Sequence, residues 1–193
     1  MVRWLVLGLT FLVSIQTLGA DKFCERTEVP TEISELRAPQ GHPKAYIISI
    51  YSIFVDLYLK GGKSFEFRKN FPCEDVNYVV FYNNKTRSIE AIGALVRTLK
   101  GHPQQIIPAT VDYSGVTEKD LWDYYKTSNF AYATEVKFSL LPDILTSSEI
   151  AQMQPDFSAP QGYSYLDKYP QLEAAIFSQI DRLVFSSNLE ATH

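Results

Sequence analysis

The segment NFAYATEVKFSL, residues 129–140, constrains the fold most, because its side chains alternate in character at every second position. One set is apolar apart from a threonine: Phe130, Tyr132, Thr134, Val136, Phe138 and Leu140. The other set is mostly small or charged: Ala131, Ala133, Glu135, Lys137 and Ser139. This pattern predicts a strand with one apolar and one largely polar face. A sheet of such strands has to protect its edges, by closing into a barrel or by stacking as a sandwich.

Other segments are also predicted to be extended. Residues 45–59, AYIISIYSIFVDLYL, are rich in β-branched and aromatic side chains, which favour strand over helix. SFEFR at 64–68 alternates, and VNYVVFY at 76–82 is a strong strand. Residues 104–113 are expected to be extended because Pro108 disfavours a helix.

A hairpin is predicted after the strand at 76–82, because Asn83 and Asn84 tolerate the left-handed turn conformation. The return limb, residues 87–99, fits two patterns. A helix would align Ile89, Ile92, Val96 and Leu99, whereas a strand would align Ile89, Ala91, Gly93 and Leu95. The Asn-Asn turn and Gly93 favour the strand.

Few helices are expected. Thr117 followed by Asp120 is typical of the start of a short helix that would reach Tyr125. Residues 142–168 carry three prolines and are interpreted as a long loop with a short helical candidate at 147–153. The last segment, about 169–187, is an amphipathic helix whose apolar face carries Leu172, Ile176, Ile180, Leu183 and Val184.

Residues 1–20 resemble a cleaved secretory signal. Arg3 provides a positive start, an apolar run follows, and Leu18-Gly19-Ala20 ends in small residues. The remainder, residues 21–193, is expected to be a single domain of a secreted, extracellular protein. It contains no second apolar stretch long enough to span a membrane.

Two further features fit an oxidising compartment. Cys24 and Cys73 are the only cysteines and are predicted to form one disulfide. Asn84-Lys85-Thr86 is an N-glycosylation sequon. The three histidines have no ligand spacing, so no metal site is expected.

Charge and motifs limit the chemistry. The chain has 18 basic and 22 acidic residues, a net charge of −4, so nucleic acid is not an expected partner. No nucleophile elbow or phosphate loop occurs, and neither an enzyme nor a cofactor is predicted. A carboxylate pair could come only from four scattered residues, which are interpreted as solvated surface charges: Asp56, Glu66, Asp112 and Glu135.

Four stretches resemble the lipocalin family, in particular its apolipoprotein D and insect bilin-binding branch. Residues 55–67 are similar to the family's opening pattern, although Gly62-Lys63-Ser64 replaces its Gly-x-Trp. Cys73 with VNY, YATEV at 132–136 and the final helix are similar to three later family patterns. The resemblance implies an antiparallel, eight-stranded β-barrel with one C-terminal helix packed outside it.

A barrel of this size holds one small ligand, so the resemblance implies secreted transport of a small hydrophobic molecule of the lipid, retinoid or tetrapyrrole class. The predicted pocket lining takes alternate residues of the clearest strands: Tyr78, Val80, Tyr82, Phe130, Tyr132, Val136 and Phe138. The alternative is a secreted interaction protein, an effector or structural glycoprotein, with a filled β core and no ligand.

Overall fold

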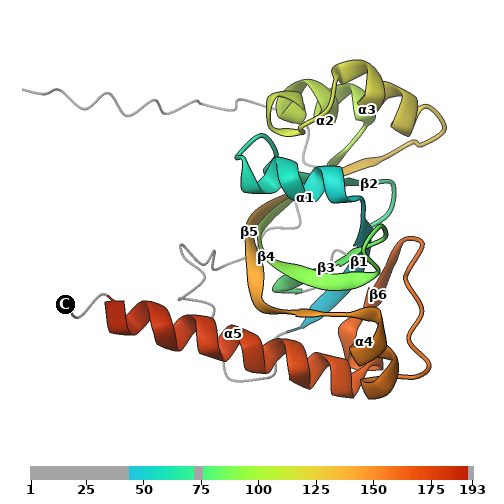
Figure 1. The fold of residues 1–193 in the computed structure, drawn as a ribbon. Helices are drawn as coiled ribbons and strands as arrows, with labels where there is room; N and C mark the ends of the chain where they lie inside the picture. Colours follow the sequence, from blue (N-terminus) through green and yellow to red (C-terminus); the bar gives the residue numbers. More distant parts are fainter. Residues whose placement is uncertain (1–43, 72–75, 191–193) are drawn as a thin grey trace, which may run out of the picture.

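A computed structural model describes residues 44–71 and 76–190, with side chains described as far as residue 182. Its centre is a curved, six-stranded mixed sheet in the order β2-β5-β4-β3-β1-β6 (Figure 1). The strands are β1 (Ala45–Ile50), β2 (Phe65–Arg68), β3 (Tyr78–Asn83), β4 (Ser88–Gly101), β5 (Ala131–Leu145) and β6 (Tyr163–Tyr165). The sheet is an open half-barrel whose edge strands are β2 and β6.

Helices cover both sides of this sheet. They are α1 (Ser52–Leu59), α2 (Pro103–Thr110), α3 (Glu118–Tyr125), α4 (Ser147–Met153) and α5 (Pro170–Glu190), with short 3-10 turns at Val111–Tyr113 and Leu166–Lys168. The long α5 lies along one side of the sheet (Figure 1). Helix α1 packs on the opposite face, and α2 and α3 cover the end of the sheet formed by β2 and the start of β5, on the face away from α1.

The predicted fold class, an antiparallel eight-stranded barrel with a single outer helix, is wrong. Strand β1 pairs with β3 in parallel, from Ala45 opposite Tyr78 to Ile50 opposite Asn83. A parallel pair needs a crossover, which α1 and β2 supply here. Alternation along a strand shows that one face is buried, but it does not show the direction of the neighbouring strand.

Residues 45–59 are a strand only in their first half. The strand ends at Ile50, and the helix α1 follows from Ser52. Its two buried residues, Val55 and Tyr58, are three positions apart, which is the spacing of one helix face. The prediction of one long strand failed because bulky apolar residues suit a short, well-covered helix as well as a strand.

The extended segment predicted at 104–113 is also wrong, because α2 occupies residues 103–110 with Pro108 inside it. Pro103 sits in the first turn, where a missing N–H costs nothing. Pro108 and Gln104, four residues earlier, are both exposed. Water can therefore satisfy the Gln104 carbonyl that Pro108 leaves without a helical partner.

Several local predictions are confirmed. Residues 88–101 form a strand antiparallel to β3, and α3 begins at a capping box of Thr117 and Asp120. The short helix at Ser147–Met153 and the late helix both form. In the hairpin turn, however, Arg87 takes the left-handed conformation with a φ of 56°. Asn83 instead accepts hydrogen bonds from the backbone of Lys85 and Thr86 through its side chain.

The segment 142–168 is only partly a loop. Strand β5 continues to Leu145, and β6 pairs antiparallel with β1. In addition, β5 does not have one polar face along its whole length. Ala131 and Ala133 on its second face are fully buried, because α2 and α3 cover this end of the sheet.

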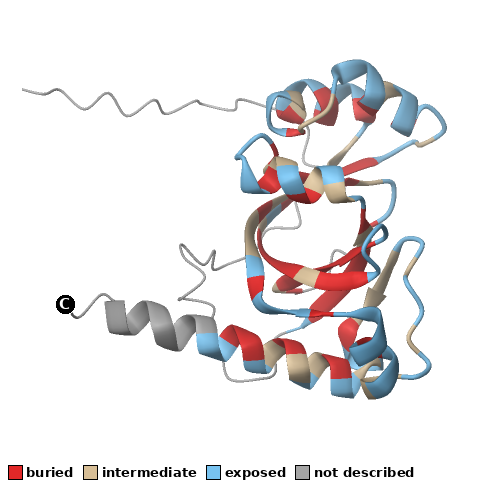
Figure 2. Cartoon of the chain, viewed as in Figure 1, coloured by how far each residue is buried: buried red, intermediate tan, exposed pale blue. Residues whose placement is uncertain are grey.

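The core is divided into three clusters. Figure 2 shows how the buried residues are distributed over the helices and strands. The first joins the sheet to α5 through Leu172, Ile176 and Ile180, which confirms the buried face predicted for that helix over its described side chains. The second lies on the opposite side of the sheet under α1. The third lies between β2, β5, α2 and α3. The late helix thus packs on a filled core.

Three predictions fall on residues outside the described ones: the signal segment 1–20, Cys24 and Cys73. Within the described part of the chain, none of the helices is both long enough and apolar enough to cross a membrane.

Buried tyrosines predict a loss of stability at high pH. Tyr78 is 2% exposed, and burial, reinforced by Asp181, raises its pKa to about 12. The unfolded chain therefore releases this proton first, and the free energy of unfolding falls by up to about 1.4 kcal/mol per pH unit between the ordinary pKa of 10.0 and about 12. Tyr58 and Tyr125, whose pKa values burial also raises, act with the same sign.

We expect urea unfolding midpoints to fall from pH 10 upwards, and to fall less steeply in Tyr78→Phe. Tyr113→Phe is the matched control, because that ring is 58% exposed. Equal slopes in the wild-type protein and in Tyr78→Phe would contradict the assignment to Tyr78.

Candidate functional site

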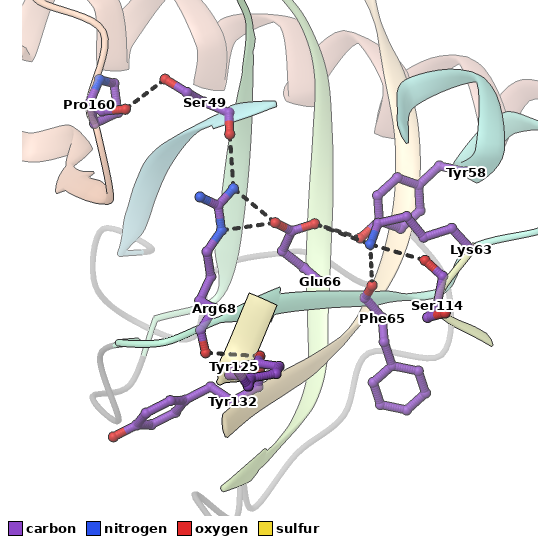
Figure 3. Close-up of polar contacts among 10 residues, drawn as sticks. All are labelled: Ser49, Tyr58, Lys63, Phe65, Glu66, Arg68, Ser114, Tyr125, Tyr132 and Pro160. Atoms are coloured by element: carbon purple, nitrogen blue, oxygen red, sulfur yellow. Dashed lines mark hydrogen bonds and ion pairs between the residues drawn. The ribbon is translucent and has the colours of Figure 1, made fainter. Parts of the chain in front are cut away.

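A pocket of about 340 Å³ opens between the start of α1, strand β2 and helix α3. Its floor carries three charged side chains, Lys63, Glu66 and Arg68. The walls are formed mainly by apolar and aromatic residues: Ile50, Tyr51, Phe54, Phe67, Val116, Leu121 and Tyr124. Figure 3 shows the polar contacts of the floor.

The alternation of β2 places the charges. Phe65 and Phe67 belong to the cluster under α2 and α3. Glu66, between them, points to the other face, where the hydroxyl group of Tyr58 donates to its Oε2 at 3.4 Å. Glu66 is only 6% exposed. A buried carboxylate needs cationic partners to offset the loss of hydration, and two are present.

The first partner is Arg68. Its Nε and Nη2 lie 2.9 and 2.8 Å from Glu66 Oε1. Nη2 also donates to the backbone carbonyl of Ser49 at 2.9 Å, at the end of β1. The hydroxyl group of Tyr125 donates to the carbonyls of Arg68 and Tyr132, which ties this end of β2 to β5 and α3. The guanidinium is therefore fixed in position. Among the described residues no acceptor is found for Nη1.

The second partner is Lys63, whose Nζ lies 3.5 Å from Glu66 Oε2. It donates to the carbonyls of Phe65 at 2.6 Å and Ser114 at 3.4 Å. The rings of Phe54, Tyr58 and Phe67 have their centroids 5.2, 5.3 and 5.2 Å from Nζ. Burial lowers the pKa of Lys63, and Glu66 opposes that shift.

The floor has two cations and one carboxylate, and so an excess of positive charge. The further acid on the wall, Asp120, is exposed and already accepts hydrogen bonds from the backbone N–H and the hydroxyl group of Thr117. Those bonds hold its pKa below the usual value. In a partly buried site this uncompensated charge favours an anion.

The mouth of the pocket is aromatic. Tyr51 is 64% exposed and Tyr124 is 40% exposed, although large rings are usually buried. Phe54 also lines the pocket and is half-buried, with its ring centroid 5.2 Å from Lys63 Nζ. Lys69 Nζ lies 5.0 Å from the centroid of the Tyr124 ring and adds a third cation, after Lys63 and Arg68, beside the pocket. The arrangement offers flat apolar surfaces above a cationic floor.

The residues predicted to line a ligand cavity lie elsewhere. Tyr78, Val80 and Tyr82 belong to the cluster under α5. The others from β5 pack in the cluster under α1: Tyr132, Val136 and Phe138. Phe130 is 50% exposed. The structure thus places the seven on different faces of the sheet and brings none of them to the pocket described above.

The interpretation of Glu66 as a solvated surface charge is wrong. Asp56 and Asp112 are exposed, and Glu135 is half-buried in an ion pair with Arg97, whereas Glu66 is buried. Lys63 and Arg68 were not identified as functional residues from the sequence. The sequence feature that could have identified them is the segment GGKSFEFR, residues 61–68. In a strand, its alternate residues place the phenylalanines on one face of the sheet and Glu66 and Arg68 on the other.

No metal site emerges from the structure: the described residues contain no group of three or more His, Cys, Asp or Glu side chains placed to hold an ion. Asn84 lies in an exposed turn.

Comparison with known proteins extends only to the fold. No protein-family model matches the sequence. No curated protein matches it either. The solved structure of ASCH from Zymomonas mobilis is similar, with 18% identity and a TM-score of 0.61 over 69% of this chain and 95% of that one. Two single-residue mutants of the same protein give TM-scores of 0.62 and 0.63, at 18% and 17% identity, over 70% of this chain and 95% and 97% of theirs.

These similarities overturn the lipocalin resemblance, because an open, mixed half-barrel is not a closed antiparallel barrel. The hydrophobic-carrier hypothesis depended on that barrel and is overturned with it. A stacked β-sandwich, the other way in which such strands were expected to protect their edges, is excluded as well, because the described strands form a single mixed sheet. The described chain has the fold of the Zymomonas mobilis ASCH protein.

Proposed function

We propose that this protein binds a nucleotide-class ligand in the pocket above Lys63, Glu66 and Arg68. A phosphate would meet the Arg68 guanidinium, and a base would lie against the aromatic residues at the mouth. The observation that carries this proposal is the floor of one buried cation, one half-buried cation and one carboxylate, in a pocket that exposed aromatic rings also line.

Arg68 is suited to receive a phosphate. Glu66 and the Ser49 carbonyl orient its planar fork from one side, and Nη1 remains for an external acceptor. A fixed guanidinium loses little conformational entropy on binding, and hydrogen bonds between two charged groups are stronger than neutral ones. Lys63 acts at longer range, because its three hydrogens already meet Phe65, Ser114 and Glu66.

The aromatic mouth is suited to a base. Base–aromatic stacking contributes about 1–3 kcal/mol per base and depends little on which base is bound. Tyr51 and Tyr124 offer exposed rings at the opening. The net charge of −4 argues against a long duplex, so the expected ligand is a single nucleotide or the end of a single strand.

The proposed role is binding and not catalysis. Glu66 engages both oxygens, with Arg68 at Oε1 and with Tyr58 and Lys63 at Oε2. Asp120 is held by the helix cap. The charged groups of Lys63, Glu66 and Arg68 therefore bind one another, and this arrangement does not favour proton transfer to a ligand.

Calorimetric titration with a nucleoside monophosphate, the matching nucleoside and inorganic phosphate tests the proposal. We expect the nucleoside monophosphate to bind more tightly than the nucleoside or inorganic phosphate alone. Its phosphate would contact the charged floor of the pocket while its base contacts the aromatic residues at the mouth. Arg68→Lys keeps the positive charge but removes the planar guanidinium group and its additional N–H donors. We expect it to weaken nucleotide binding about 10- to 100-fold, which corresponds to the loss of one or two charge-assisted hydrogen bonds.

The matched control is Arg97→Lys, which alters an exposed ion pair with Glu135 outside the pocket and should leave binding unchanged. Thermal unfolding of both variants separates loss of binding from loss of folding. Equal affinity for nucleoside and nucleotide, or the absence of nucleotide binding to the folded wild-type protein, would contradict the proposal.

A further inference from the structure

The unpaired edge of strand β2 borders the pocket. Among the described strands, β2 pairs with β5 alone and so forms one edge of the sheet. The pocket is lined from both faces of this strand. Ile50 belongs to the cluster under α1, whereas Phe67 and Leu121 belong to the cluster between β2, β5, α2 and α3. A pocket that reaches both faces of an edge strand passes along its unpaired side, where the strand can also offer main-chain groups.

The register of β2 identifies these main-chain groups. The N–H of Val136 donates to the carbonyl of Ser64 at 2.8 Å, at the start of the β2–β5 ladder. Residues that bond across an antiparallel ladder alternate with residues that do not. The N–H and C=O groups of Phe65 and Phe67 therefore point away from β5. Lys63 Nζ, which lies outside β5, donates to the Phe65 carbonyl at 2.6 Å, as this direction requires (Figure 3).

The main chain of Phe67 is open to a ligand. No residue in the described ranges, 44–71 and 76–190, forms a hydrogen bond with its N–H or its carbonyl. Phe67 lines the pocket although it is only 8% exposed. Main-chain groups with so little accessible surface are nearly always paired in folded proteins. A ligand that presents one acceptor and one donor side by side is therefore favoured at this point.

The edge of a nucleobase has this arrangement. The nitrogen and the carbonyl oxygen of one extended residue lie about 3 Å apart and point to the same side of the strand. On the pairing edge of adenine, the acceptor N1 stands next to the amino group at C6. A peptide that added a strand to β2 would need a longer row of free groups, and the Phe65 carbonyl is already bound by Lys63.

We propose that the main chain of Phe67 binds the pairing edge of the base, with its N–H donating to N1 of adenine and its carbonyl accepting from the amino group. This inference rests on the nucleotide site proposed above, in which aromatic rings meet the faces of the base and leave its edges free. Every base has an adjacent acceptor and donor on its pairing edge. The site therefore takes an unpaired base with little preference for its identity, and it excludes a base within a duplex.

Calorimetric titration with adenosine monophosphate and three analogues tests the ligand side. We expect the 1-deaza analogue, which lacks N1, and purine riboside monophosphate, which lacks the amino group, each to bind about tenfold more weakly. The 7-deaza analogue changes only the opposite edge of the base and should bind as well as adenosine monophosphate. Equal affinities for all four would overturn the inference but leave the nucleotide proposal standing. A loss confined to the 7-deaza analogue would overturn the assignment to the pairing edge, and no binding of adenosine monophosphate would overturn both proposals.

Replacement of Phe67 by phenyllactic acid tests the protein side, because it turns the N–H into an ester oxygen and keeps the ring. We expect adenosine monophosphate to bind this protein about tenfold more weakly, and the 1-deaza analogue to bind it as it binds the wild type. The same replacement at Phe65, whose N–H also points away from β5 but which is absent from the lining, is the control and should not alter binding. Thermal unfolding checks that both proteins are folded. Equal losses at the two positions, or for the two ligands, would overturn the role of the Phe67 N–H.

Discussion

Replacing Glu66 with glutamine should lower the free energy of unfolding by about 3 kcal/mol, because removal of one partner leaves buried charge uncompensated. The substitution preserves the shape of the side chain and removes only its charge. Lys63 and Arg68, with side chains 5% and 16% exposed, would then face each other without a carboxylate between them.

The pH dependence of Glu66→Gln gives a second readout. Burial already lowers the pKa of Lys63, and loss of Glu66 should lower it further. The unfolded chain then binds more protons than the folded one between the lowered pKa and the ordinary value of 10.5. The stability of the variant should therefore rise with pH in that window, and more steeply than that of the wild-type protein.

Urea unfolding at several pH values measures both effects, with Glu135→Gln as the matched control. Glu135 pairs with Arg97 at 2.6 Å, but the two side chains are 31% and 57% exposed. Such pairs contribute about 0–1 kcal/mol, so the control should change little. If the two variants lost the same small amount, the network of Lys63, Glu66 and Arg68 would not be the buried, coupled unit described above.

Local structure was predictable where one physical cause dominates. The capping pair Thr117 and Asp120 fixes the start of α3, and the spacing of Leu172, Ile176 and Ile180 fixes the buried face of α5. Residues 52–59 and 103–110 were predicted to be extended, but their surroundings in the folded chain favour helices. In the first segment, the sheet covers Val55 and Tyr58 on one helix face. In the second, Pro108 is exposed to solvent, which makes its place inside a helix tolerable. The order of the strands in the sheet and the parallel pairing of β1 with β3 could not be predicted, because neither depends on the residue pattern of any single segment.

The site was harder to predict than the fold. Lys63, Glu66 and Arg68 lie within six residues of one another, and this proximity is visible in the sequence. Their burial is not visible, because it depends on Tyr58 from α1, Ser114 from the segment before α3, and Ser49 from β1. A charged residue on a short alternating strand is usually solvated. Glu66 is buried at the floor of the pocket only because the chain crossover places β2 at the edge of the sheet, beside α1 and α3.

Replacing Gly93 with alanine should destabilise the protein by about 3 kcal/mol, at the upper end of what overpacking a core costs. Gly93 lies in β4 with Val79 and Phe138 opposite it on the neighbouring strands. An added Cβ would overlap Val136 Cγ1 and lie 3.0 Å from Val79 Cγ1 and 3.2 Å from Phe81 Cε2. These side chains belong to the filled cluster under α1 and have little room to move.

Thermal and urea unfolding measure the loss, and two further variants identify its cause. Gly162→Ala is the control for the change of residue type, since its Cβ would meet no atom within 4 Å, and it should stay within about 0.5 kcal/mol of the wild-type protein. Val136→Ala should offset part of the cost of Gly93→Ala, because it removes the methyl group that overlaps. Residues in direct contact are expected to have non-additive effects on the free energy of unfolding. If the losses caused by Gly93→Ala and Val136→Ala simply added in the double variant, the destabilisation by Gly93→Ala would not come from its overlap with Val136.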